Sequence, residues 1–195
     1  MTCIVGFLDK NNDCVWIGGD SLGSNYYTKS VQSPSKVFRH DVFKNVIMGS
    51  TTTFRHIDLL KYSDAIFDKI DFYENAVLDH KYMVTKFIPK VIDLFKNGII
   101  SEYEKDRGGN FIVGAKNRLF EIQCDYAVLE PIDGICAVGS GSDVAMGSLL
   151  TTLDMDMTPI NKVQLALQAA EKHCCGVQRP FHIINTKDEN VITID

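Results

Sequence analysis

Apolar residues follow two patterns along the chain: short runs typical of β-strands, and longer stretches in which they recur at helical spacing. The short runs predict strands at 3–8, 14–19, 37–39, 46–48, 111–113, 119–124, 127–129, 135–138, 181–185 and 191–194. Helical spacing predicts helices over about 54–70, 77–97, 143–153 and 159–174. The polar stretch between them at 21–35 is interpreted as a loop, and Pro89 is expected to kink the second helix.

The order of these elements is strands, two helices, strands, two helices, strands. Runs of strands separated by helix pairs favour an α+β fold in layers. Two antiparallel sheets face to face, each covered outside by a helix pair, would bury every apolar stripe. We therefore predict a four-layer αββα sandwich. The length suits one domain, 1–195, and no repeat or low-complexity linker divides it.

Composition narrows the classes of function. Apolar residues make up 45% and charged residues 23%, the balance of an ordinary globular protein. The net charge of −5 and the lack of a basic run argue against a nucleic-acid partner. No stretch has the ~20 apolar residues that would span a bilayer, and the first apolar run is too short for a signal peptide. Six cysteines without CxxC spacing predict reduced thiols in a cytoplasmic protein.

The first strand begins directly after Thr2, in the sequence TCIVGF. If Met1 is removed, Thr2 carries a hydroxyl and a free α-amine on one residue. A threonine hydroxyl needs a base to act as a nucleophile, and a terminal amine with a pKa of about 7.7–8.0 is suited to that task. Thr2 is therefore a candidate nucleophile, although it could equally be an ordinary first residue.

Other polar residues stand where strands end. Asp20 closes the second strand and Lys36 opens a later one, so the two could form an ion pair whose cation lowers the pKa of the amine. Gly49 ends a strand before a polar helix start, and its N–H could bind an oxyanion. Ser140 lies in a tight GSGS turn.

Two other stretches of the sequence contain residues that occur in nucleotide or metal sites. The stretch AVGSGSDVAMG at 137–147 is rich in glycine but fits neither GxGxxG nor a P-loop. His173, Cys174 and Cys175 are adjacent, but no second ligand cluster has suitable spacing. We therefore predict neither a nucleotide, nor a metal, nor another cofactor.

Taken together, the chain resembles the proteasome β-subunit family of N-terminal nucleophile hydrolases, and most of all the bacterial HslV-type threonine peptidase. The resemblance lies in TCIVGF, in the sixteen positions between Asp20 and Lys36, in Gly49, in the GSGS turn at Ser140 and in PFHIIN near the end. It spans nearly the whole chain. The sequence departs from the family in having Cys3 where many relatives have a second threonine, and in a longer first turn.

The resemblance implies an αββα fold and a threonine endopeptidase that acts on polypeptides. Thr2 would be the nucleophile and its own amine the base, acting through a water or Ser140. Lys36 would tune the amine, Asp20 would support Lys36, and the Gly49 N–H would stabilise the oxyanion. Such proteins form homo-oligomeric rings, and an ATP-dependent unfoldase is their typical partner.

Two alternatives stay open: a catalytically inactive assembly protein of the same fold, and a small-molecule amidase of the N-terminal nucleophile group. Amidases of this group often begin with cysteine, and Cys3 would require the removal of two residues. For a peptidase, we predict that Phe38, Ile47 and Thr51 shape the first specificity pocket and favour an apolar or small side chain.

Overall fold

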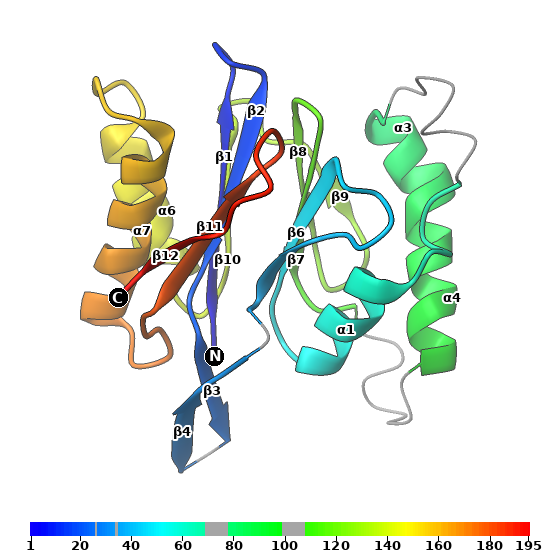
Figure 1. Ribbon diagram of the computed structural model, residues 1–195, viewed down its shortest axis with the longest axis horizontal. Coiled ribbons are helices and arrows are strands. Elements are labelled where there is room, and N and C mark those ends of the chain that lie inside the picture. Colours follow the sequence, from blue (N-terminus) through cyan, green and yellow to red (C-terminus); the bar gives the residue numbers. More distant parts are fainter. Residues whose placement is uncertain (26, 34, 69–77, 99–107) are drawn as a thin grey trace.

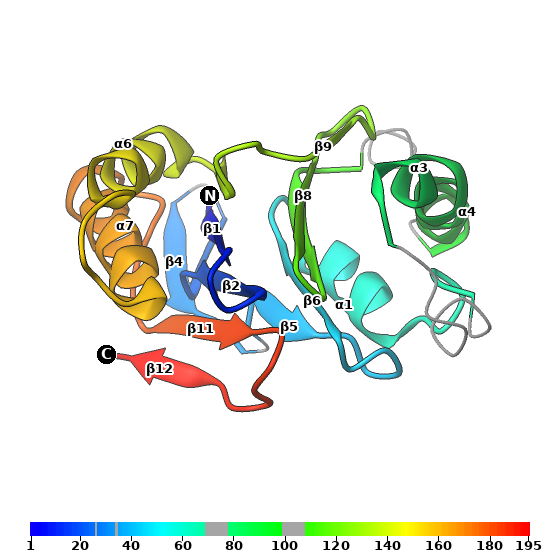
Figure 2. The ribbon, with the colours of Figure 1, turned by 90° about the horizontal axis from the view of Figure 1, so that it is seen from above.

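Two antiparallel sheets pack face to face in the computed structural model, and helices cover the outer face of each (Figure 1). The structure describes residues 1–25, 27–33, 35–68, 78–98 and 108–195. Seen from above, the layers follow one another as helices, sheet, sheet and helices (Figure 2). The predicted αββα sandwich is confirmed.

Among the described residues, each large sheet has five strands. The first sheet has the order β10-β1-β2-β11-β12, with β10 Ile135–Gly139, β1 Cys3–Asp9, β2 Cys14–Gly19, β11 Phe181–Asn185 and β12 Ile192–Ile194. The second has the order β5-β6-β7-β8-β9, with β5 Val37–Arg39, β6 Val46–Ser50, β7 Phe111–Ala115, β8 Arg118–Ile122 and β9 Val128–Leu129. The N-terminal strand thus lies inside the first sheet, between two neighbours.

The helices form the two outer layers. Those on the first sheet are α6 (Ser142–Thr152) and α7 (Pro159–His173), and those on the second are α1 (Phe54–Tyr62), α3 (His80–Tyr82), the π-helical turn η1 (Met83–Phe87) and α4 (Ile88–Gly98). Thr158 caps α7 through its side chain, which accepts from the Asn161 amide, and Pro159 takes the first helical position as predicted.

Apolar side chains fill all three spaces between the layers. In the described parts of the chain, the central space between the sheets holds side chains from strands, among them Ile4, Ile17, Ile47 and Ile112. One outer space lies under α6 and α7, and the other lies under α1 and α4. Because the sheets have apolar residues on both faces, their strands appear in the sequence as continuous apolar runs instead of alternating ones.

Part of the predicted loop at 21–35 is a hairpin, which corrects that interpretation. Strands β3 (Leu22–Asn25) and β4 (Thr28–Val31) pair with each other and project from the body next to the N-terminus (Figure 1). Every residue of β4 is exposed, and β3 contributes the buried Leu22, so the hairpin has no continuous apolar face. A strand without a buried face leaves no hydrophobic period in the sequence, which explains why it was missed.

The first helix pair also differs from the prediction. Helix α1 ends at Tyr62, because Ser63 adopts an extended conformation, so the helix does not continue through 63–68. Pro89, where a kink is expected, lies in the first turn of α4 directly after η1, in which the Ile88 amide bonds the Met83 carbonyl five residues back. Proline has no N–H to continue an α-helical ladder, and a π-turn absorbs that defect. The predicted start of this helix at 77 lies outside the described residues.

His56 is a buried histidine with an unusual environment on α1. Its ring stacks on Phe95 with centroids 4.3 Å apart, and among the described residues neither ring nitrogen has a hydrogen-bond partner. Burial lowers the pKa of His56 from 6.5 to about 4. The unfolded chain therefore binds more protons than the folded one between these two values, and stability falls as the pH drops through that window.

We expect His56→Phe to remove this acid sensitivity. A pKa fall from 6.5 to about 4 corresponds to about 3 kcal/mol of stability, which is intact above pH ~6.5 and lost by pH ~4. Urea unfolding at several pH values should show that the free energy of unfolding falls less on acidification in His56→Phe than in the wild type. His173→Gln, at an exposed position, serves as the control. Equal pH dependence in His56→Phe and wild type would contradict this assignment.

Among the described residues, no helix is both long and apolar enough to cross a membrane.

Candidate active site

Thr2 is fixed where β1 enters the first sheet, and only 6% of the residue is exposed. The neighbouring Cys3 pairs with Gly139 across the sheet, and the Gly141 amide donates to the Thr2 carbonyl over 3.3 Å. Gly139 has a φ of +100°, and a Cβ there would lie 2.3 Å from the Thr2 carbonyl oxygen. Only glycine at position 139 allows this close approach to the Thr2 carbonyl. The GSGS turn therefore holds the backbone of Thr2 in place.

Asp20 and Lys36 form a buried ion pair beside Thr2. Lys36 Nζ lies 2.9 and 3.0 Å from the two carboxylate oxygens, and the side chains are 4% and 0% exposed. Burial lowers the pKa of Lys36, and the charge of Asp20 opposes that fall. The carboxylate also accepts from the amides of Cys3 and Leu22, each over 2.9 Å. A buried charge with this many partners is held in one position.

This pair and Ser140 converge on the first two residues of the chain. Lys36 Nζ donates to the Met1 carbonyl over 3.4 Å, and Thr2 Oγ1 donates to the same oxygen over 2.5 Å. The Thr2 nitrogen donates to Ser140 Oγ over 3.1 Å. The structure thus brings together four of the residues singled out from the sequence, Thr2, Asp20, Lys36 and Ser140, although their roles remain predictions.

A cavity of about 470 Å³ opens beside these residues. Its lining comes from the start of the chain, the β3 strand, Lys36, and the stretch from the end of β6 into α1: Met1, Thr2, Leu22, Gly23, Ser24, Lys36, Ser50, Thr51, Thr52, Thr53, Phe54 and Ile57. Of the three predicted specificity residues, only Thr51 lines it. Its hydroxyl donates to the Asn110 carbonyl over 2.7 Å.

Phe38 and Ile47 do not reach this cavity. Phe38 packs in the layer under α1 and α4, whereas Ile47 packs between the two sheets, so their side chains lie on opposite faces of one sheet. Both are almost fully buried. The structure therefore places both side chains in the core. They lie on opposite faces because Phe38 pairs with Met48, and Ile47 is one position along β6 from Met48.

Gly49 does not line the cavity either. It lies within β6, opposite Val37 of β5 and Ile112 of β7, and a Cβ there would lie 2.4 Å from the Ile4 side chain of the facing sheet. Because Gly49 has no side chain, the two sheets can pack closely at this position. Whether its amide also binds an oxyanion stays a prediction.

The cavity wall at Ser50–Thr53 contains Thr51, the one predicted specificity residue that lines it, whereas the sequence analysis does not single out Thr52 beside it. Thr52 has a φ of +75°, a conformation that is strained for a β-branched residue. Its amide makes no hydrogen bond to the described residues. Strained backbone conformations are concentrated at active sites and ligand-binding sites, so this part of the cavity lining is a candidate binding surface.

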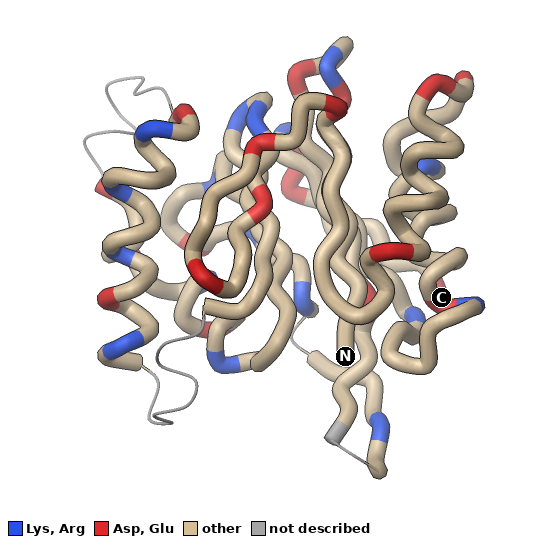
Figure 3. Tube along the Cα trace, turned by 180° about the vertical axis from the view of Figure 1, so that it is seen from behind, with Lys and Arg blue, Asp and Glu red and all other residues tan. Residues whose placement is uncertain are grey.

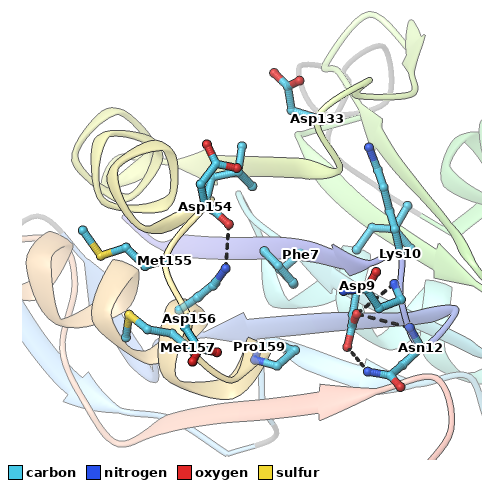
Figure 4. A pocket seen from close by; sticks show the side chains of 14 residues that line it. Phe7, Asp9, Lys10, Asn12, Asp133, Asp154, Met155, Asp156, Met157 and Pro159 are labelled. Atoms are coloured by element: carbon cyan, nitrogen blue, oxygen red, sulfur yellow. Dashed lines mark hydrogen bonds between the residues drawn. The ribbon is translucent and has the colours of Figure 1, made fainter.

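A larger cavity of about 690 Å³ lies at the other end of β1. Acidic residues mark that end, on the turn after β1 and on the connection between α6 and α7 (Figure 3). Phe7 and Pro159 form part of its lining, with Asp154 and Asp156 around them (Figure 4). It contains none of the candidate residues, and no group of three metal-ligating side chains occurs in the described parts of the chain.

The four layers, with the first residues held inside a sheet beside a buried lysine, define the proteasome-like N-terminal nucleophile hydrolase fold. Among solved structures, the chain is similar to HslV from Trypanosoma brucei, with a TM-score of 0.66 and 19% identity over 94% of this chain and 98% of that one. It is also similar to Thiobacillus denitrificans BPH, with a TM-score of 0.70 and 14% identity over 95% and 97%. An Anbu (Gly-1) mutant from Hyphomicrobium sp. strain MC1 has a TM-score of 0.66 and 14% identity over 100% and 87%.

No protein-family model and no curated protein matches the sequence. At these identities the structural matches establish the fold.

Proposed function

We propose that this chain is a threonine-type endopeptidase subunit of a self-compartmentalising protease, in which removal of Met1 frees the amine of Thr2. The observation that carries the proposal is the buried cation beside the first peptide bond, with Lys36 Nζ 3.4 Å from the Met1 carbonyl and 2.9 Å from Asp20. Burying a charge is costly unless the charge is paired and hydrogen-bonded. Lys36 is paired with Asp20, and its ammonium group also points to the first peptide bond of the chain.

In the proposed reaction, the free amine of Thr2 takes the proton from its own Oγ1, directed by a water or by Ser140. Oγ1 then attacks the carbonyl carbon of a substrate peptide bond. Lys36 lowers the pKa of the amine, so that more of it is unprotonated and able to act as a base. The tetrahedral intermediate collapses to an ester on Thr2, and the leaving amine receives the proton. Water then hydrolyses the ester and restores the site.

The developing oxyanion requires a backbone donor. Gly49 is the donor that the family resemblance implies. The Thr52 amide is a second candidate, because it belongs to the cavity wall and has no partner among the described residues. Of the two, Thr52 belongs to the cavity lining, whereas Gly49 lies within β6 and does not.

The proposal includes polypeptide substrates, a homo-oligomeric ring and an ATP-dependent unfoldase as partner. A structure of Thiobacillus denitrificans BPH in complex with epoxomicin has a TM-score of 0.70 to this chain, at 13% identity over 94% of it and 97% of that chain. This supports a site of similar architecture that accepts a peptide-like ligand. In the cavity here, Leu22–Ser24 and Ser50–Thr53 offer backbone to an extended peptide.

A cysteine-dependent amidase is less well supported. Cys3 is fully buried and packs in the layer under α7. Burial, together with the charge of Asp20, raises the pKa of Cys3 to about 12, so it carries little of the reactive thiolate at neutral pH. Thr2 is therefore the better placed nucleophile.

The intact mass of protein made in cells is expected to show loss of Met1. While Met1 remains, the Thr2 nitrogen is an amide and cannot accept a proton. Protein lacking Met1 should form an ester adduct with an electrophilic β-lactone, and peptide mapping should locate the adduct at Thr2. The control is a variant that keeps an additional residue before Thr2. Its Thr2 nitrogen is an amide, so it should not react. Protein that lacks Met1 and still forms no adduct at Thr2 would refute the proposed function.

A further inference from the structure

Two adjacent cysteines, Cys174 and Cys175, follow α7 and lie next to the residues that hold Thr2. Cys174 is half-buried and Cys175 is exposed. Three of the other cysteines are buried in the fold, and the fourth, Cys124, is exposed on another part of the chain. The pair is therefore the place where two accessible thiols are neighbours.

The segment that contains the pair contacts the candidate site directly. Cys174 Sγ donates to the Ser140 carbonyl over 3.2 Å. Gly176 packs so closely that a Cβ there would lie 2.7 Å from Ser140 Oγ and 2.5 Å from the Met1 Cβ. Ser140 Oγ in turn accepts from the Thr2 nitrogen. The segment is therefore in direct contact with the hydrogen-bond partner of Thr2.

A disulfide between adjacent cysteines must change that backbone. Neighbouring Cα atoms lie ~3.8 Å apart across a trans peptide, whereas unstrained disulfides join Cα atoms ~4.4–6.8 Å apart. Closing the ring between Cys174 and Cys175 thus requires a local distortion. Strained, exposed disulfides are also the ones that are reduced most readily, which suits a reversible modification.

We propose that Cys174 and Cys175 are a thiol modification site: a disulfide of the glutathione class oxidises them to a vicinal disulfide, which draws Ser140 away from Thr2. The thiolate of Cys175 attacks the reagent disulfide and releases one thiol, forming a mixed disulfide. The thiolate of Cys174 then attacks the Cys175 sulfur and releases the second thiol. The two cysteines lose two electrons, the reagent gains them, and the two released thiols take the two protons.

The effect on Thr2 reactivity rests on the proposed function, whereas formation of the disulfide and movement of Ser140 do not. The full chain lacking Met1 is treated with oxidised glutathione and then mapped without reduction. We expect a peptide that is lighter by two hydrogen atoms and contains Cys174 and Cys175. Hydrogen exchange at 139–142 should rise, because the Gly141 amide bonds the Thr2 carbonyl. The rate of β-lactone addition at Thr2 should fall about tenfold, the effect of losing one good hydrogen bond, and recover with dithiothreitol.

The matched variants are Cys175→Ser, which leaves no partner for Cys174, and Cys124→Ser, which removes the exposed thiol elsewhere. Cys175→Ser should show neither the disulfide nor the rise in exchange, and Cys124→Ser should behave as wild type. A wild-type disulfide that leaves exchange at 139–142 unchanged, or no disulfide at all, would overturn the inference. If the reduced wild-type protein fails to react at Thr2, the proposed function fails. Peptide mapping and hydrogen exchange still test whether the disulfide forms and moves Ser140.

Discussion

Thr2→Ala is expected to abolish cleavage of peptide reporters and addition of β-lactones, while the fold and any assembly survive. The hydroxyl is the only group that the proposed chemistry uses for bond formation, and removing an enzymatic nucleophile lowers turnover by roughly 10⁴- to 10⁶-fold. The substitution deletes a small side chain and leaves the Thr2 nitrogen bonded to Ser140 Oγ. Stability should therefore change little.

Thr2→Ser is the matched control, because it keeps a hydroxyl at the same atom position. It should retain measurable turnover, with loss of Met1 verified by mass in both variants. Circular dichroism and light scattering test whether the fold and the assembly are preserved. Turnover in Thr2→Ala equal to that of wild type would exclude Thr2 as the nucleophile.

Lys36→Ala is expected to damage both stability and activity. It leaves the Asp20 carboxylate buried without a cation, and breaking a buried ion pair from one side costs about 3–5 kcal/mol. Loss of the cation also raises the pKa of the Thr2 amine, so less of the base is unprotonated near neutral pH. Turnover should fall by at least about 100-fold, and the acid limb of the pH–rate profile should move to higher pH.

Two further variants separate these effects. Asp20→Asn combined with Lys36→Met removes both charges, so it should recover much of the stability but none of the activity. Lys44→Ala breaks an exposed pair with Asp41, whose side chains are 55% and 61% exposed, and should change neither property measurably. Full activity in the double variant would remove Lys36 from the mechanism.

The layer order was predictable because the strands and helices of the core carry strong apolar patterns. Strands β1, β2 and β11 lie within one residue of their predicted bounds, and α7 ends one residue early, at His173. The hairpin β3–β4 was missed for the opposite reason, since β4 is exposed throughout and Leu22 is the buried apolar side chain of β3. Pattern analysis detects a repeated buried face, and one buried leucine does not make such a pattern.

The candidate site was predictable only in part. Asp20, Lys36 and Ser140 stand at the ends of strands, and the packing of the two sheets brings those ends to Thr2. Phe38 and Ile47 were misplaced as cavity residues because the sequence does not reveal which face of an edge hairpin turns toward a cavity. The Thr52 backbone was missed because a positive φ at a β-branched residue leaves no mark in the sequence pattern.

The insertion of the first residues into the sheet has a practical consequence for anyone producing this protein. Met1 is half exposed but packs against Gly176, and Thr2 is buried behind it. An affinity tag on that side would crowd the GSGS turn and leave an amide where a free amine is wanted. Asp195 instead follows the edge strand β12 at the exposed opposite terminus, so purification handles belong there (Figure 1).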